Sequence, residues 1–136
     1  CGKLPGAIVP VLSAFKKSMA MSFATRIRPA VDHELAVATR TVERNAQFHH
    51  LERAHVLGQA STREHVRVHW RMFRWALRER DTREAIGQLV RIVGAATKTA
   101  IGLVPHGNTG GANVSPFRRM PIAPELAARI ARARQP

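Results

Sequence analysis

Residues 48–70 read FHHLERAHVLGQASTREHVRVHW, and they decide the fold class. The first half carries apolar side chains at three-residue intervals, which indicates an amphipathic helix: Phe48, Leu51, Ala54 and Leu57. Gly58 follows as a C-terminal stop, and Ser61 or Thr62 is placed to cap a second helix with Glu64 in its first turn. Two helices joined by so short a turn pack antiparallel, so this stretch predicts a helical hairpin.

Helical periodicity continues on both sides of the hairpin. A helix of about twenty residues is predicted around Pro29 from the apolar positions Ile27, Val31, Leu35, Ala38 and Val42. The second hairpin helix is expected to reach about Arg80, with one face made of Val66, His69, Trp70, Phe73, Ala76 and Leu77. Asp81 or Thr82 then caps another helix, whose expected core stripe is Ile86, Leu89, Val90, Val93, Ala96 and Ala100. No convincing strand appears, so the expected fold is all-α, a set of antiparallel helical hairpins.

Composition divides the chain into four segments. Residues 1–20 hold two prolines, two glycines and no acidic side chain, and we expect them to be an extension that is added, tagged or processed. Residues 21–104 are expected to form the helical bundle domain. Residues 105–124 are rich in glycine and proline and predict a long ordered loop, and residues 125–136 predict a short basic helix.

Charge and cysteine content narrow the classes of function. The 136 residues carry 22 Lys and Arg against 9 Asp and Glu, a net charge of +13 that favours encounter with phosphate, nucleic acid or anionic lipid. One cysteine cannot form an internal disulfide, so a cytoplasmic location is expected. The longest apolar stretch is interrupted by Arg91 and Lys98, so no transmembrane segment is expected.

Four side chains of the hairpin are predicted to converge on a metal ion. Residues whose numbers sum to about 120 face one another across an antiparallel hairpin that turns near 58–61, which pairs His55 with His65, and Glu52 or Leu51 with His69. Helical spacing puts Glu52 and His55 on one face and His65 and His69 on another. Three imidazoles and a carboxylate suit a divalent transition metal such as Zn, Cu, Ni, Co or Fe. The alternative is a set of buried histidines satisfied by carboxylates or backbone carbonyls.

Two further histidines are candidate additional ligands, His50 one turn before the cluster and His106 in the loop. The loop also suggests an anion site, because glycine and asparagine tolerate positive φ and successive N–H groups can form a concave nest. The residues of that candidate anion site are Gly107, Asn108, Gly110, Gly111, Arg118 and Arg119. The alternative is an ordered turn that packs against the bundle.

Two segments resemble a small bacterial helical family of unknown function. They are HVLGQ at residues 55–59 and GNTGGANVS at residues 107–115. The resemblance covers about residues 22–125, and it implies metal handling because such genes are often met near heavy-metal efflux and metal-responsive regulator genes. Residues 46–54, AQFHHLERA, are similar to the second helix of a tetratricopeptide-type pair, which implies the hairpin geometry but no repeat array.

The sequence therefore predicts a helical protein that binds a divalent transition metal through its Glu/His cluster, as an accessory to metal handling or tolerance. One alternative is a basic interaction module that binds RNA, a ribosomal surface, a partner protein or a second copy of itself. A third is an enzyme that holds a phosphate ligand in its glycine-rich loop. No nucleophile motif such as Gly-x-Ser-x-Gly is present, which leaves catalysis open and disfavoured.

Overall fold

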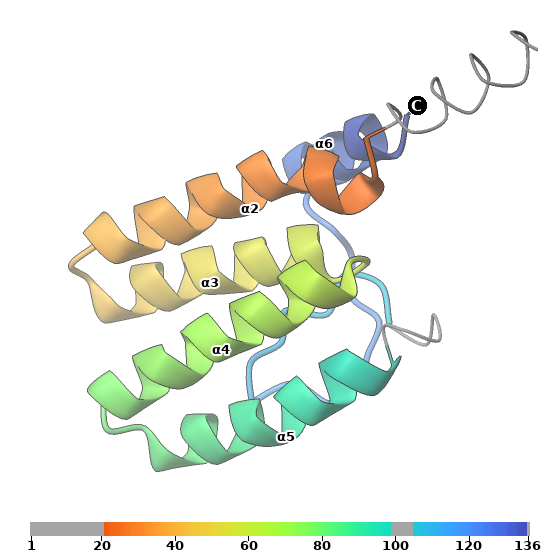
Figure 1. Cartoon of the computed structure of the whole chain (residues 1–136). Coiled ribbons are helices and arrows are strands. Elements are labelled where there is room, and N and C mark those ends of the chain that lie inside the picture. The colour runs from red at the N-terminus through yellow and green to blue at the C-terminus, as the bar shows by residue number, and fades with distance from the viewer. Residues whose placement is uncertain (1–20, 99–104, 136) are drawn as a thin grey trace, which may run out of the picture.

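The computed structural model describes residues 21–98 and 105–135, and within these residues it contains α-helices and no strand (Figure 1). The predicted all-α class is therefore confirmed. The helices are α2 (Phe23–Arg40), α3 (Arg44–Gly58), α4 (Thr62–Arg78), α5 (Thr82–Lys98) and α6 (Pro124–Arg134). The N-terminal extension predicted for residues 1–20 lies outside the described residues.

Two antiparallel helical hairpins make the body of the protein. Helix α2 packs on α3 and α4 packs on α5, while α3 and α4 join the two pairs (Figure 1). Helix α6 lies against α2 and α3. Residues 105–123 lead into α6 and have no regular secondary structure.

Local signals set the helix ends where the sequence places them. Ser61 Oγ accepts a hydrogen bond from Glu64 N at 3.4 Å and caps α4. Asp81 Oδ1 accepts from Glu84 N at 2.9 Å at the start of α5. Helix α3 ends at Gly58, where a side chain would lie 3.1 Å from the Cβ of Glu64. A side chain at position 58 would crowd this turn, where α3 and α4 approach closely.

The predicted core face of α2 is confirmed. Ile27, Val31, Leu35 and Ala38 are buried, whereas Val42 lies past the end of the helix and is exposed. On α3, the predicted positions Leu51, Ala54 and Leu57 are also buried.

The predicted core stripe of α5 is wrong. Its large apolar side chains are more than half exposed: Ile86, Leu89, Val90 and Val93. The inner face carries Glu84, Ala85, Gln88 and Ala95 instead, all of them buried. A hydropathy pattern predicts that the more apolar face of a helix is buried. On α5 the polar side chains of the inner face have hydrogen-bond partners inside the protein, and these bonds offset the cost of burying them. Position 100 of the predicted stripe lies outside the described residues.

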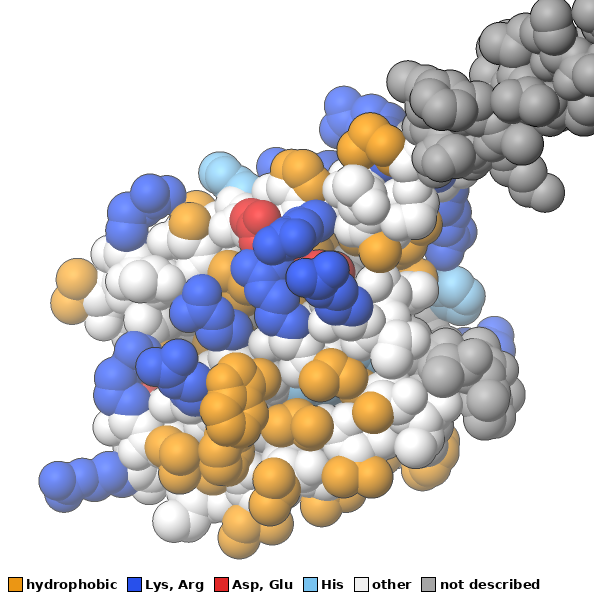
Figure 2. All heavy atoms as spheres, viewed as in Figure 1, with side chains coloured by type: hydrophobic (Ala, Val, Ile, Leu, Met, Phe, Trp, Pro, Cys, Tyr) orange, Lys and Arg blue, Asp and Glu red, His pale blue; other side chains and the backbone are white. Residues whose placement is uncertain are grey.

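Helix α4 contributes to the same outer surface. Trp70 and Leu77, predicted to face the core, are half exposed or more, while Val68, Met72 and Trp75 are buried. Figure 2 shows apolar side chains gathered over α4 and α5, with basic side chains above them.

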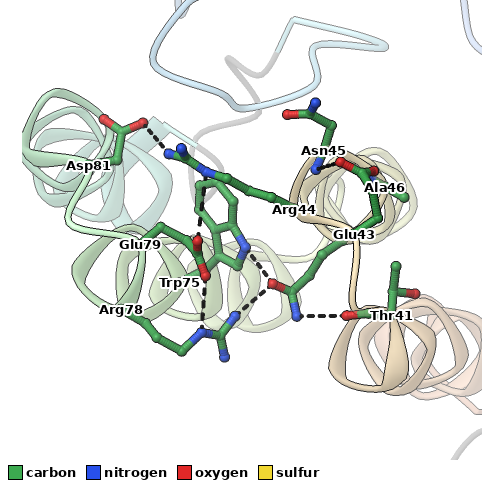
Figure 3. A network of polar contacts seen from close by, with 10 residues as sticks. Thr41, Glu43, Arg44, Asn45, Ala46, Trp75, Arg78, Glu79 and Asp81 are labelled. Atoms are coloured by element: carbon green, nitrogen blue, oxygen red, sulfur yellow. Dashed lines mark hydrogen bonds and ion pairs between the residues drawn. The ribbon is translucent and has the colours of Figure 1, made fainter.

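A polar network ties the two hairpins together at the ends away from the α3–α4 turn (Figure 3). Gln47 is its centre, because its Oε1 accepts hydrogen bonds from Trp75 Nε1 and Arg78 Nη2, each at 2.7 Å. The Gln47 amide nitrogen donates to the carbonyl of Ala38 at 2.8 Å. Arg44 lies 5.4 Å above the Trp75 ring, a cation–π distance. The network fixes the relative position of α3 and α4.

The buried carboxylate of Glu34 connects α2 to α3 and, through Arg53, to α6. Glu34 of α2 accepts hydrogen bonds from Arg53 Nε at 3.1 Å and Nη2 at 3.2 Å, and its Oε2 lies 2.8 Å from His50 Nδ1. Arg53 also donates to Glu125 at 2.7 Å. Burial raises the pKa of Glu34, but the bonds from Arg53 and His50 outweigh it and leave that pKa below its usual value.

None of the helices in the described part of the chain combines the length and the apolar character needed to cross a bilayer.

Candidate metal centre

Three of the predicted ligands lie together at the closed end of the α3–α4 hairpin. His55 is in the last turn of α3, and His65 and His69 are one turn apart in the first half of α4. Nε2 of His69 lies 3.1 Å from Nε2 of His55 and 3.2 Å from Nε2 of His65. All three rings are buried, and one ligand nitrogen from each lies within 4.8 Å of the others, a group that could hold a metal ion.

Hydrogen bonds fix the proton position on two of the rings. Nδ1 of His55 lies 2.8 Å from the carbonyl oxygen of Asn108, which can only accept, so this nitrogen carries the proton. Nδ1 of His69 lies 2.6 Å from Oε1 of Gln88 and donates to it in the same way. In the neutral rings, Nε2 of His55 and Nε2 of His69 are therefore both unprotonated. Two nitrogen lone pairs face each other at 3.1 Å.

The orientation of the Gln88 amide follows from its other contacts. Its nitrogen donates to Glu84 Oε1 at 2.5 Å and to the carbonyl of Gly110 at 2.8 Å, so the remaining amide atom is the oxygen that faces His69. Glu84 in turn accepts from Ala112 N, at 2.9 Å to Oε2 and 3.1 Å to Oε1. A continuous chain of buried hydrogen bonds thus runs from the loop through α5 to His69.

The environment favours neutral imidazoles. Burial lowers the pKa of His65 to about 3, with the neighbouring His69 contributing in the same direction. Burial also lowers the pKa of His69 to about 4, against the opposing hydrogen bond to Gln88. For His55, burial and then the other two imidazoles hold the pKa well below its usual value. The three rings are therefore neutral at neutral pH, and the neutral ring is the form of histidine that can bind a metal ion.

The glycine-rich loop covers His55. Gly110 has a φ of 83°, and a Cβ there would lie 2.8 Å from ring atoms of His55. Both facts require glycine, the first because side chains are strained at this φ and the second because the ring fills the space.

A pocket of about 440 Å³ opens beside the three histidines, and all three line it. The other wall residues come from α5 and the loop, and most are apolar or glycine: Gly87, Val90, Arg91, Gly94, Ala95, Pro105, Asn108, Ala112 and Pro116. The cluster therefore has one side covered by Gln88 and the loop, and another that faces a cavity.

The fourth predicted ligand does not join this group. Glu52 hydrogen-bonds to Thr109 of the loop, and its Oε2 lies 3.7 Å from Nδ1 of the exposed His49. Burial raises the pKa of Glu52. The two candidate additional ligands also lie elsewhere. His50 contacts Glu34, and His106 is exposed at the edge of a separate, smaller pocket between α3 and α6.

The loop residues of the predicted anion site have partners within the protein. Gly107 and Gly110 have positive φ, as expected from a nest. Asn108 folds the loop, because its side chain accepts from Gly110 N and donates to the carbonyls of Ser115 and Arg118. Gly111 is buried, and its carbonyl accepts from Arg91 at 2.9 Å.

Two carboxylates of the protein already meet this loop, Glu84 through the N–H of Ala112 and Glu52 through Thr109, while the side chains of Arg118 and Arg119 are exposed. An external anion bound at the loop stays a prediction.

Sequence reasoning missed three residues that shape the cluster: Glu84, Gln88 and Arg91. The spacing of Glu84 and Gln88, one turn apart on α5 with Arg91 close behind, was the available signal, because polar side chains at helical spacing can share an inner face. The apolar stripe on the opposite face of the same helix outweighed it.

Comparison with curated proteins and with solved structures gave no match. Comparison with family models gave a match over residues 25–130, which include the described helices α2 to α6 apart from the first residues of α2 and the last of α6. The chain therefore belongs to DUF3703, a family described as proteins of unknown function.

Proposed function

We propose that the protein binds one divalent transition metal ion through the Nε2 atoms of His55, His65 and His69, and that it serves metal handling or tolerance. The observation that carries the proposal is the contact between Nε2 of His55 and Nε2 of His69 at 3.1 Å. Their Nδ1 atoms donate elsewhere, so two lone pairs repel each other unless a cation lies between them. The low pKa values of the cluster disfavour the proton in that role.

The spacing of the nitrogens supports a tetrahedral ion. Two nitrogens that bind zinc at about 2.0–2.1 Å in a tetrahedral site lie roughly 3.3–3.4 Å apart. Two of the three separations, 3.1 Å and 3.2 Å around His69, are close to that value, and the ligand nitrogens of all three rings lie within 4.8 Å of one another.

The surroundings of the rings support the same reading. Metal-binding histidines usually donate their second N–H to a carbonyl or a carboxylate, which orients the ring and raises its basicity as a ligand. The carbonyl oxygen of Asn108 accepts this hydrogen bond from His55. The side-chain oxygen of Gln88 accepts it from His69, and Gln88 is itself held by a hydrogen bond to Glu84. The same two bonds would also satisfy the buried N–H groups of a purely structural cluster, but only a cation between the rings makes use of the two lone pairs that these bonds turn toward each other.

Imidazole nitrogen suits Zn, Co, Ni, Cu and Fe. Glu52, the fourth predicted ligand, and His50 and His106, the predicted additional ligands, lie outside the group of three histidines in this structure, and their binding to the ion stays a prediction. The basic interaction module and the phosphate-binding enzyme also stay predictions, and salt-dependent binding to RNA or phosphate would support them.

Elemental analysis of the purified protein tests the proposal, with His55→Ala and His69→Ala beside His33→Ala, which removes an exposed histidine of α2. We expect about one metal ion per chain in wild type and in His33→Ala, and loss of the ion in the other two variants while the helical circular dichroism persists. Wild-type protein that holds no metal and takes up none of the five added ions would refute the proposal.

A further inference from the structure

The pocket beside the histidine cluster is larger than a metal ion needs. Its volume of about 440 Å³ falls in the range of sites that hold small organic molecules. Its walls are mostly apolar, with Val90, Ala95, Ala112 and Pro116 among them. A site that only stored an ion would be closed around it by four protein ligands.

We propose that this pocket binds a small monoanion with an apolar body, such as a carboxylate, whose anionic head takes the position that the three histidines leave open on the metal. The inference rests on the proposed metal site and adds an exchangeable ligand to it.

Coordination supplies the first argument. Three protein nitrogens leave a fourth position free in a tetrahedral site, the arrangement of zinc centres that bind substrate or water. The rings of His55 and His69 are held on one side by Asn108 and Gln88. All three histidines also line the pocket, so the uncovered side of the cluster faces it.

Charge supplies the second argument. Arg91 is the one lining residue among those described that carries a permanent charge, and no carboxylate lines the pocket. Its Nη2 donates to the carbonyls of Gly111 and Val114, which keeps the guanidinium at the wall. Burial lowers the pKa of Arg91, yet an arginine stays cationic at neutral pH. A bound metal and Arg91 together make the pocket positive, which favours an anion.

Gly94 offers a way to fill the pocket without touching the histidines. It lines the pocket from α5, and a Cβ placed there meets no heavy atom within 4 Å. Gly94→Leu therefore adds a side chain into free space. Ala96→Leu is the matched control, because Ala96 is exposed on the same helix and does not line the pocket.

The experiment uses the full chain loaded with Co(II), whose visible absorption reports the ligands around the ion. Acetate, butanoate and hexanoate are titrated into it, with hexanamide as the neutral counterpart of hexanoate. We expect the carboxylates to change the cobalt spectrum and hexanamide to leave it unchanged. Affinity should rise on the order of tenfold for each two-carbon step, because each buried methylene contributes about fourfold.

The variants locate the ligand. We expect Gly94→Leu to keep the cobalt spectrum and to lose at least tenfold in hexanoate affinity, with little change for acetate, while Ala96→Leu matches wild type. If no protein-bound cobalt spectrum forms, the metal site itself is refuted. If it forms but no carboxylate alters it, or if acetate and hexanoate act at equal concentrations in wild type and Gly94→Leu, the metal site stands and the pocket assignment is overturned.

Discussion

Acidification should destabilise the metal-free protein in the pH range set by its buried histidines. The folded-state pKa values of His65, about 3, and His69, about 4, lie below the 6.5 of an unfolded histidine. Below pH 6.5 the unfolded chain therefore binds more protons than the folded one, and stability falls as pH falls. The stability that the two neutral histidines contribute is fully present above pH 6.5, and it is lost progressively as the pH falls toward their folded-state pKa values.

The size of the effect follows from the same values. At pH 5, about 1.5 pH units below 6.5, each of the two histidines costs about 2 kcal/mol relative to neutral pH, at 1.36 kcal/mol per unit. Together they remove about 4 kcal/mol, a large part of the 5–15 kcal/mol that stabilises a typical domain. The lowered pKa of His55 also makes the free energy of unfolding fall as the pH falls. Glu34, the other buried group with a lowered pKa, acts only below pH 4.5.

Urea denaturation followed by circular dichroism between pH 8 and pH 5, with a chelator present, measures this loss. We expect His65→Gln to show a loss about 2 kcal/mol smaller, because glutamine does not titrate. His33→Gln, which removes an exposed histidine, should behave as wild type. A free energy of unfolding that stays constant from pH 7 to pH 5 would show that the cluster is not buried in neutral form.

Three other predictions concern packing, the loop and the ion. Ile86→Ala on the outer face of α5 should change the free energy of unfolding by no more than about 0.5 kcal/mol, whereas Leu57→Ala should cost about 2–5 kcal/mol in urea titrations. Gly110→Ala should cost more than 1 kcal/mol and weaken zinc binding measured by calorimetry, because of its φ and the ring of His55, while Gly94→Ala should be neutral or stabilising. Zinc at 100 times its dissociation constant should add about 2.7 kcal/mol to the free energy of unfolding, and a chelator should reverse the gain.

The sequence was sufficient for the hairpins and for the core of the cluster. Periodicity, the cap at Ser61 and the stop at Gly58 fix the register of α3 against α4, and that register brings His55 to His65 and His69. These are short-range features, so they can be read without knowing the rest of the fold.

The long-range features could not be read in this way. The side of α5 that faces the bundle depends on Gln88 meeting both His69 and Gly110, and these partners lie 19 and 22 positions away. The departure of Glu52 from the cluster depends on its bond to Thr109 of the loop. Hydropathy carries no information on such pairings, because each one offsets the cost of a buried polar group that appears unfavourable on its own.

The distance along the chain between His55 and Asn108 has a consequence for the order in which the site is assembled. His65 and His69 come together with one turn of α4, and His55 joins them when the hairpin closes. The carbonyl of Asn108, which fixes the tautomer of His55, lies 53 positions further along the chain. Contacts between near neighbours in sequence form earlier, because they close smaller loops. We expect the three histidine nitrogens to come together first, while their rings can still change orientation. Residues 105–123 then pack over the cluster, and we expect this step to set the rate at which a bound ion dissociates.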